Sequence, residues 1–343
     1  MSFHLAVVLL VAVALSLVIL FHFAVLLPRM AAQALPAQSI ARKHLRQLRV
    51  SKMDKDVVAI VSLQKSGSTL LCYVCALVNT RNAITHFRND FDLVPMLSFP
   101  QSMIAQNFNA RQDGHCQLYK INGRVRSLRT DIAEAGIGRT IWMCRDFGGY
   151  YRSVYWWVTR FYPRVKPLPL LPLRIAYFLR FVGWNLFKKL TFRLLARDHV
   201  EELWCAYKLA RSTPRWQFLA LSYEHLTAEK GETLRRLAEW FSIDLDDELI
   251  VAIAEKTSKR AMAEGDRFDP VNFGDGGGQT KINLAPHGYQ LDGRDMALYQ
   301  KIFTRRFAGT GIRNYADYIE VMRRLQSVAP DEENPAGATI AAS

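Results

Sequence analysis

A short turn near position 66 carries groups that could bind a phosphate. It lies between an apolar, β-branched run and a longer apolar segment, and reads Leu63-Gln64-Lys65-Ser66-Gly67-Ser68-Thr69. A turn between a strand and a helix offers backbone N–H groups to an anion, and here Lys65 adds charge and the neighbouring Ser and Thr residues add hydroxyls. Because Lys65 precedes the glycine, the turn fails the GxxxxGK[ST] pattern, which disfavours an ordinary P-loop ATPase. A plain helix cap remains the alternative.

A second turn places an arginine and a serine eight residues apart. Arg145 comes at the end of an apolar run, and Ser153 lies about one turn into the next expected helix. An Arg supplies a fork of donors and a Ser supplies a hydroxyl, which together suit a phosphate monoester. The alternatives for Arg145 are an ion pair with Asp146 and a surface role.

These two turns resemble the nucleotide motifs of one enzyme family. LQKSGSTLL at 63–71 resembles the 5′-phosphosulfate loop of the sulfotransferases, and CRDFGGYYRS at 144–153 resembles their 3′-phosphate motif. Three later stretches follow the family's order and approximate spacing: HVEELW at 199–204, FLALSYEHL at 218–226 and EKTSKRAMAEGD at 255–266. The resemblance covers residues 56–310. It implies one P-loop-like α/β domain that binds 3′-phosphoadenosine 5′-phosphosulfate (PAPS) and moves its sulfuryl group to a hydroxyl or amine.

The resemblance also implies roles for individual residues. Lys65 would contact the sulfuryl and 5′-phosphate oxygens, where a fixed cation stabilises the charge that develops on the leaving oxygen. The other donor-binding positions are Ser66, Gly67, Ser68 and Thr69 for the 5′-phosphate, Arg145 and Ser153 for the 3′-phosphate, and Thr257 or Ser258 near the adenine. No metal ion is expected.

The sequence departs from the family at the general base. Cytosolic sulfotransferases carry Lys, one residue and then a His on a strand, whereas the similar run here ends in Asn122, which cannot accept a proton. In the protein-tyrosine and glycan branches the base is an acidic residue shortly after the first helix. Counting without gaps from Lys65 brings that position to Thr85-His86, of which His86 is the first choice. An unperturbed imidazole pKa near 6.5 suits this role. Asp90 and Asp92 are alternative bases, and a loop-surface position for His86 is the other interpretation.

A second departure lies near the C-terminus. The family usually places an RKG-like cluster there that also holds the 3′-phosphate, whereas this chain reads FGDGGGQTKINLAPHGYQ at 273–290. Lys281 is the candidate substitute, with Arg267 as an alternative. The glycines of this stretch indicate a flap.

The rest of the chain alternates strand-like and helix-like segments. Short apolar runs predict strands at 56–63, 116–122, 140–145 and 216–223, and longer patterns predict helices at 69–78, from 150 and at 231–241. This alternation predicts an α/β fold whose parallel sheet is flanked by helices. Such sheets bind ligands at the carboxyl ends of their strands.

Composition excludes several classes of protein. Half of the 343 residues are apolar and 22% are charged, which argues against a disordered, collagen-like or disulfide-scaffold chain. The five cysteines are an odd number and lack a second closely spaced pair, so we expect reduced core residues rather than a zinc site.

The N-terminus predicts a membrane anchor. Only three polar residues interrupt positions 3–27, and a helix of that length spans roughly 37 Å against an apolar bilayer core of about 30 Å. A cleaved signal peptide ending near Ala34 is the alternative. Lys and Arg are frequent in 28–55, which predicts a cytoplasmic catalytic domain. The expected organisation is an anchor at 1–27, a basic juxtamembrane linker at 28–55, the sulfotransferase-like domain at 56–326 and a disordered tail at 327–343.

The positive charge is concentrated in one region. The net charge is +14, and residues 147–197 contain ten Lys or Arg and no Asp or Glu. Such a stretch favours a local anionic partner, and its Leu and Pro content suits a lipid boundary better than a nucleic acid, so no nucleic-acid partner is expected. The sequence therefore predicts a membrane-anchored sulfotransferase acting on a lipid, glycolipid or glycan. A kinase with an atypical phosphate loop and an inactive polyanion-binding module are the alternatives.

Overall fold

The computed structural model describes residues 57–62, 66–81, 115–122, 139–156, 183–258, 260–262 and 289–327. Several residues from the sequence analysis lie outside these ranges: Lys65, His86, Asp90, Asp92, Arg267, Lys281 and the expected anchor at 1–27. No helix within the described ranges is both long enough and apolar enough to span a bilayer.

The described strands form one parallel sheet. The strands are β1 (Val57–Ser62), β2 (Gln117–Asn122), β3 (Arg139–Cys144) and β4 (Phe218–Ser222), in the spatial order β2-β1-β3-β4. Ser62 pairs in register with Met143, and Cys144 with Ser222, so the carboxyl ends of β1, β3 and β4 lie at one edge. The four expected strands are confirmed, with ends shifted by one or two residues.

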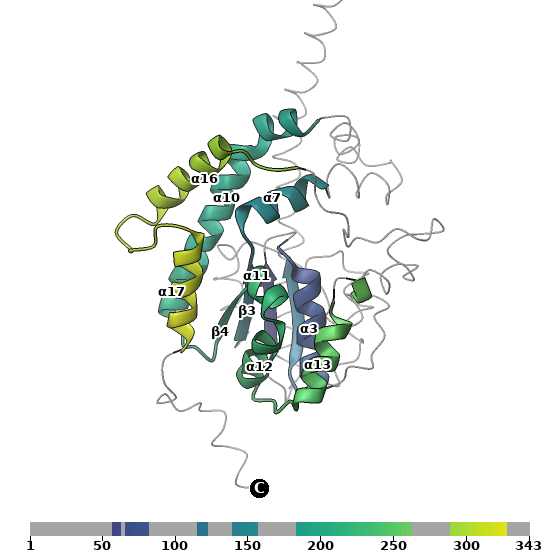
Figure 1. Cartoon of the computed structure of the whole chain (residues 1–343). Helices are drawn as coiled ribbons and strands as arrows, with labels where there is room; N and C mark the ends of the chain where they lie inside the picture. Colours follow the sequence, from purple (N-terminus) through teal and green to yellow (C-terminus); the bar gives the residue numbers. More distant parts are fainter. Residues whose placement is uncertain are drawn as a thin grey trace, which may run out of the picture.

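Helices cover both faces of this sheet (Figure 1). One face carries α3 (Ser68–Thr80), α11 (Tyr223–Ala228), α12 (Lys230–Phe241) and α13 (Asp247–Lys256). The other face carries α7 (Phe147–Trp156), α10 (Trp184–Ser212), α16 (Gly293–Arg306) and α17 (Tyr315–Ser327). The expected α/β architecture is confirmed.

Alternation along the strands produces two separate cores. Val58 and Ile60 of β1 pack with α3 and α12, whereas Ala59 and Val61 pack with α7, α10 and α17. Successive side chains of a strand point to opposite faces, so apolar residues at every position require a helical layer on each side. All five cysteines are free and four of them are buried, as the sequence predicts.

The start of α7 differs from the expectation. The sequence predicts a turn at Gly148 and Gly149 with a helix from Tyr150, but α7 begins at Phe147 and includes both glycines. The reason is Asp146, whose carboxylate accepts a hydrogen bond from the N–H of Gly149 at 2.7 Å and so caps the helix. Ser153 consequently lies in the second turn of α7, and Arg145 follows β3 instead of ending it.

Candidate active site

The two motif loops lie at the point where the strand order of the sheet reverses. From β1 the chain goes to β2 on one side, and from β3 it goes to β4 on the other. The loop at 66–67 follows β1 and the loop at 145–146 follows β3, so both leave the carboxyl ends of adjacent central strands. In open parallel sheets this crevice is the usual ligand site.

The loop after β1 leaves its helix start without a side-chain cap. Gly67 is the N-cap of α3, has φ +97° and provides no capping side chain. The first-turn N–H groups of a helix have no partner within the helix, so an anion placed here would meet several donors. A Cβ at position 67 would overlap the ring of Tyr223 and lie 3.1 Å from the Met143 sulfur, so only glycine fits.

Two buried hydroxyls accompany this loop. Ser62 ends β1 and Ser66 begins the loop, and both side chains are almost fully buried. Neither hydroxyl has a hydrogen-bond partner among the described residues. A buried polar group without a partner is costly, and a bound oxyanion would satisfy it. The residues present therefore fit a phosphate at this end of the site.

The loop after β3 positions its arginine against an aromatic ring. The Arg145 guanidinium carbon lies 4.2 Å from the ring centre of Tyr223, the first residue of α11. This cation–π contact holds the guanidinium plane against the ring. The same ring contacts the position of Gly67, so Tyr223 lies against both loops. Gly149 allows the close packing, because a Cβ there would lie 2.7 Å from Nε of Arg145.

A buried histidine holds the backbone of the second loop. His199 of α10 is 1% exposed, and its Nε2 lies 2.8 Å from the carbonyl oxygen of Arg145. A carbonyl only accepts, so Nε2 carries the proton and Nδ1 accepts from the Tyr299 hydroxyl at 3.0 Å. Burial lowers the pKa of His199 to about 4, which keeps the ring in this neutral form.

A half-buried carboxylate holds the loop from the other side. Glu224 accepts hydrogen bonds from the backbone N–H of Asp146 at 3.1 Å and from the Tyr315 hydroxyl at 3.0 Å. Burial raises the pKa of Glu224, because desolvation disfavours its charged form. Tyr315 also lies 3.4 Å from the Cys144 sulfur, so α17 is connected to the end of β3.

The predicted site residues fall into two groups. Ser66, Gly67 and Arg145 come together around Tyr223 at the carboxyl edge of the sheet. Ser153 lies half-buried on α7, the helix that follows Arg145. The proposed adenine residues are already engaged elsewhere: the Thr257 hydroxyl donates to the Ile253 carbonyl at 2.8 Å, and the Ser258 hydroxyl accepts from the Ala261 N–H. Within the described ranges, no hydrogen bond joins Thr257 or Ser258 to either loop.

Three positioning residues escaped the sequence analysis. Tyr223, Glu224 and His199 all lie in stretches that follow the sulfotransferase order, but nothing in their spacing indicates which loop they contact. For two of them the sequence offered a signal: Tyr223 and Glu224 come directly after the buried strand β4, and residues at the carboxyl ends of parallel strands lie at the usual ligand-binding edge.

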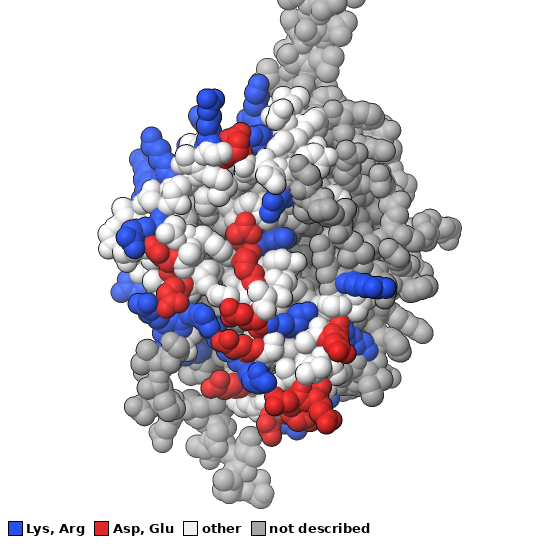
Figure 2. All heavy atoms as spheres, viewed as in Figure 1, with Lys and Arg blue, Asp and Glu red and all other residues white. Residues whose placement is uncertain are grey.

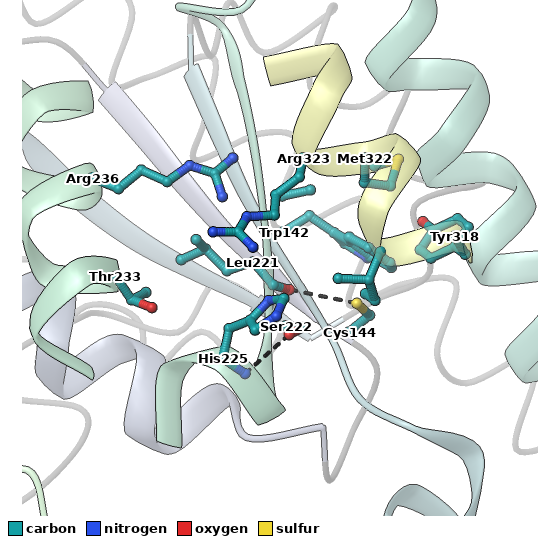
Figure 3. A pocket seen from close by; sticks show the side chains of 12 residues that line it. Trp142, Cys144, Leu221, Ser222, His225, Thr233, Arg236, Tyr318, Met322 and Arg323 are labelled. Carbon is teal, nitrogen blue, oxygen red and sulfur yellow. Dashed lines mark hydrogen bonds between the residues drawn. The ribbon is translucent and has the colours of Figure 1, made fainter. Parts of the chain in front are cut away.

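A small cavity lies near this site, at the side of β4 that faces away from β3 (Figure 3). Its volume is about 30 Å³, which suffices for one or two waters and not for a nucleotide. Arg236 and Arg323 point into it, but Arg236 donates to Gln326 and Arg323 forms a 2.8 Å ion pair with Glu232. The cavity therefore belongs to the packing of α12 against α17.

The fold and the two loops define an α/β protein with a candidate anion site at the carboxyl ends of β1 and β3. The model of the sulfotransferase domain family matches residues 54–272, and the chain belongs to this family. The protein is thus a PAPS-dependent enzyme, and PAPS is its co-substrate.

Solved structures share this fold. A mouse sulfotransferase, SULT7A1, complexed with PAP is 15% identical, with a TM-score of 0.52 over 84% of this chain and 94% of that chain. A retinol dehydratase in complex with androsterone and the inactive cofactor PAP is 14% identical, with a TM-score of 0.50 over 81% of this chain and 88% of that one. No curated protein sequence matches the chain.

Proposed function

We propose that the protein is a membrane-anchored sulfotransferase that transfers the sulfuryl group of PAPS to a hydroxyl or amine on a lipid, glycolipid or glycan. The observation that carries the donor half is the position of Tyr223, which lies against both Gly67 and Arg145. Two anion-binding loops that share one aromatic ring are close enough for a single doubly phosphorylated nucleotide.

Each loop has a separate task in this proposal. Arg145 and Ser153 hold the 3′-phosphate, and the 66–69 loop holds the 5′-phosphate with backbone N–H groups and hydroxyls. Bound PAPS supplies an activated sulfuryl group. Lys65 comes three positions after the last residue of β1 in the sequence, and in this proposal its charge acts on the leaving oxygen, so that its contribution is larger in the transition state than in the ground state. Replacing Lys65 by Ala should lower kcat by about 100-fold to 1,000-fold.

The acceptor must lose a proton during transfer. His86 is the proposed general base, with Asp90 and Asp92 as the alternatives. Replacing His86 by Ala should abolish transfer and leave PAP binding unchanged. Unchanged turnover in this variant would assign the role to one of the two aspartates.

The acceptor class rests on the chain's relation to a bilayer. The apolar stretch at 3–27 would anchor the enzyme, and the basic linker at 28–55 would face the cytoplasm. An enzyme tethered to a bilayer by such a linker meets amphipathic acceptors at high local concentration. A lipid, a glycolipid or a lipid-linked glycan is therefore the proposed substrate class.

Transfer of radiolabelled sulfuryl groups tests the proposal. Membranes containing the full chain are incubated with labelled PAPS, and lipids, glycans and proteins are then separated. We expect label in the lipid or glycan fraction, and its loss in Arg145→Ala. Arg313→Ala is the matched control, because this exposed arginine pairs only with Asp317 among the described residues. Label in protein alone would refute the acceptor class, and the absence of any transfer would favour an inactive polyanion-binding module.

A further inference from the structure

Helix α10 carries two parallel rows of exposed side chains on its first four turns. Leu186, Leu190 and Leu194 are 48%, 52% and 59% exposed. A cation follows each leucine three residues later, and all three cations are exposed: Lys189, Arg193 and Arg197. Residues three and four apart lie on the same side of a helix, so the leucine row and the cation row run side by side.

The opposite side of the same segment belongs to the protein core. Phe187, Phe192 and Ala196 are buried against α7 and α16. The fold therefore needs this helix only on one side, and packing does not account for leucines on the other. Three large apolar residues in one exposed row are unusual for a surface that faces only water.

The cations of this surface have no anionic partner among the residues that the structure describes. Lys188, on the neighbouring side of α10, is bound by Asp292 and Asp295 of α16. In contrast, none of the three row cations forms an ion pair with any residue in the described ranges. From Trp184 to Arg197 the helix contains no acidic residue. The surface is thus complementary to an anionic, partly apolar partner.

Charge is distributed unevenly over the described residues on the face that Figure 2 shows. Figure 2 shows Lys and Arg gathered at the end where α10 begins, and Asp and Glu gathered at the end near α12 and α13. The acidic end contains four exposed residues, two in the connection between these helices and two in the first turn of α13: Asp244, Asp246, Asp247 and Glu248. Such a separation of charge would orient the domain, with its α10 end toward a negative surface.

We propose that this α10 surface docks on an anionic lipid bilayer, with the leucine row at the headgroup–acyl boundary and the cation row among the headgroups. The inference extends the membrane part of the proposed function, but it stands on the described surface of the domain and not on residues 1–27. It fixes which side of the catalytic domain faces the bilayer. An anchor alone would leave the domain free to rotate.

Spin labels on the full chain test this orientation. Leu190→Cys and Val251→Cys each receive a nitroxide, and the signal of labelled wild type is subtracted because Cys205 is partly exposed. Val251 is the matched control, since it is an apolar residue of α13 with 56% exposure. The chains are reconstituted into phosphatidylcholine vesicles with or without phosphatidylserine. We expect phosphatidylserine to reduce collisions of a water-soluble nickel chelate with the label at 190 about tenfold and to leave position 251 unchanged.

Charge variants separate this docking from general attraction. Lys189→Gln, Arg193→Gln and Arg197→Gln together should weaken the phosphatidylserine-dependent docking that buries the label at 190 about 100-fold, at about fivefold per removed cation. Three exposed or ion-paired cations elsewhere give a control with the same change in net charge: Lys208→Gln, Arg211→Gln and Arg235→Gln. The control should retain the burial of the label.

Several results would overturn the inference. A label at 190 that stays accessible to the chelate in anionic vesicles would refute it. Shielding of this label without vesicles, with spin–spin broadening, would show that a second copy covers the surface instead. The proposed function fails separately. A chain that co-floats with vesicles while the label at 190 stays in water would contradict only this inference. A buried label at 190 without sulfuryl transfer would contradict only the proposed activity.

Discussion

The two loops at the carboxyl edge of the sheet are built in different ways. The loop after β1 depends on a glycine in the left-handed region and contains a buried serine hydroxyl without a partner in the described chain. The loop after β3 is held by His199, Glu224 and Tyr223, which come from α10 and α11.

This difference separates two ways of preparing an anion site. In the first loop, the Ser66 hydroxyl and the start of α3 have no side-chain partner among the described residues, which lowers the stability of the ligand-free protein. The second loop fixes its arginine in advance through its backbone and an aromatic ring, which reduces the ordering required on binding. We therefore expect substitutions in the second loop to affect affinity most and substitutions in the first to affect stability as well.

The largest effect should come from Arg145→Ala. Loss of a guanidinium that pairs with a phosphate should weaken binding of adenosine 3′,5′-bisphosphate by about 4 kcal/mol, or roughly 1,000-fold in Kd. Binding of 5′-AMP, which lacks the 3′-phosphate, should change far less. Calorimetric titration of both nucleotides measures the difference. Equal losses would show that Arg145 does not bind the 3′-phosphate.

The pH dependence of stability tests the histidine that holds the second loop. An unfolded His binds a proton near pH 6.5, whereas folded His199 does so only near pH 4, so the unfolded state binds more protons between these values. The group should therefore remove about 3 kcal/mol of stability as the pH falls from 6.5 to 4. His199→Gln keeps a donor and an acceptor but does not titrate. Denaturant unfolding should show less acid destabilisation in this variant, and identical pH profiles would contradict the assignment.

Gly67→Ala tests the first loop. A positive φ disfavours alanine, and its Cβ would displace the Tyr223 ring, so the free energy of unfolding should fall by about 2 kcal/mol. Gly183→Ala is the matched control, because φ there is −59° and a Cβ meets no atom within 4 Å. Thermal unfolding of both variants measures the effect. If Gly67→Ala weakened nucleotide binding more than Arg145→Ala, the comparison between the loops would be reversed.

The smallest effect should come from Glu224→Gln. Burial raises the pKa of Glu224 above its usual value of about 4.5. As the pH falls, the folded state therefore takes up the proton before the unfolded state does. The free energy of unfolding should fall as the pH rises from about 4.5 through the raised pKa. The two hydrogen bonds end on different oxygens of Glu224, so the Gln oxygen can still accept from the Asp146 N–H while its NH2 group faces the Tyr315 hydroxyl, which can accept as well as donate. The Gln side chain does not titrate. Stability near neutral pH should change by less than about 1 kcal/mol, and the variant should lose this part of the pH dependence. A large loss of stability at neutral pH would show that the carboxylate's charge is required.

Much of the fold could be predicted from the sequence because the strands are short apolar runs separated by polar turns. β1, β3 and β4 each fill one such run, and the helices between them have the length and pattern expected of crossovers. The start of α7 could not be predicted from its two glycines. Gly148 and Gly149 indicate a turn, but the capping carboxylate of Asp146 outweighs their low helix propensity.

The site was predictable in part for a related reason. Ser66, Gly67 and Arg145 carry their chemistry in local motifs, whereas their supports come from far along the chain. Glu224 lies 78 positions from the residue it holds, and His199 lies 54 positions from Arg145. Local patterns do not encode such contacts.

The sequence alone determined the four short strands, the first helices between them and the two candidate turns, because each depends on residues within about ten positions of one another. The order of the motifs along the chain indicated the family. Only the tertiary structure decided that both turns meet at Tyr223 and that the leucines on one side of α10 are exposed. The physical reason is that parallel strands bring their carboxyl ends together only after long crossovers, so the neighbours of Tyr223 are set by sheet order and helix packing.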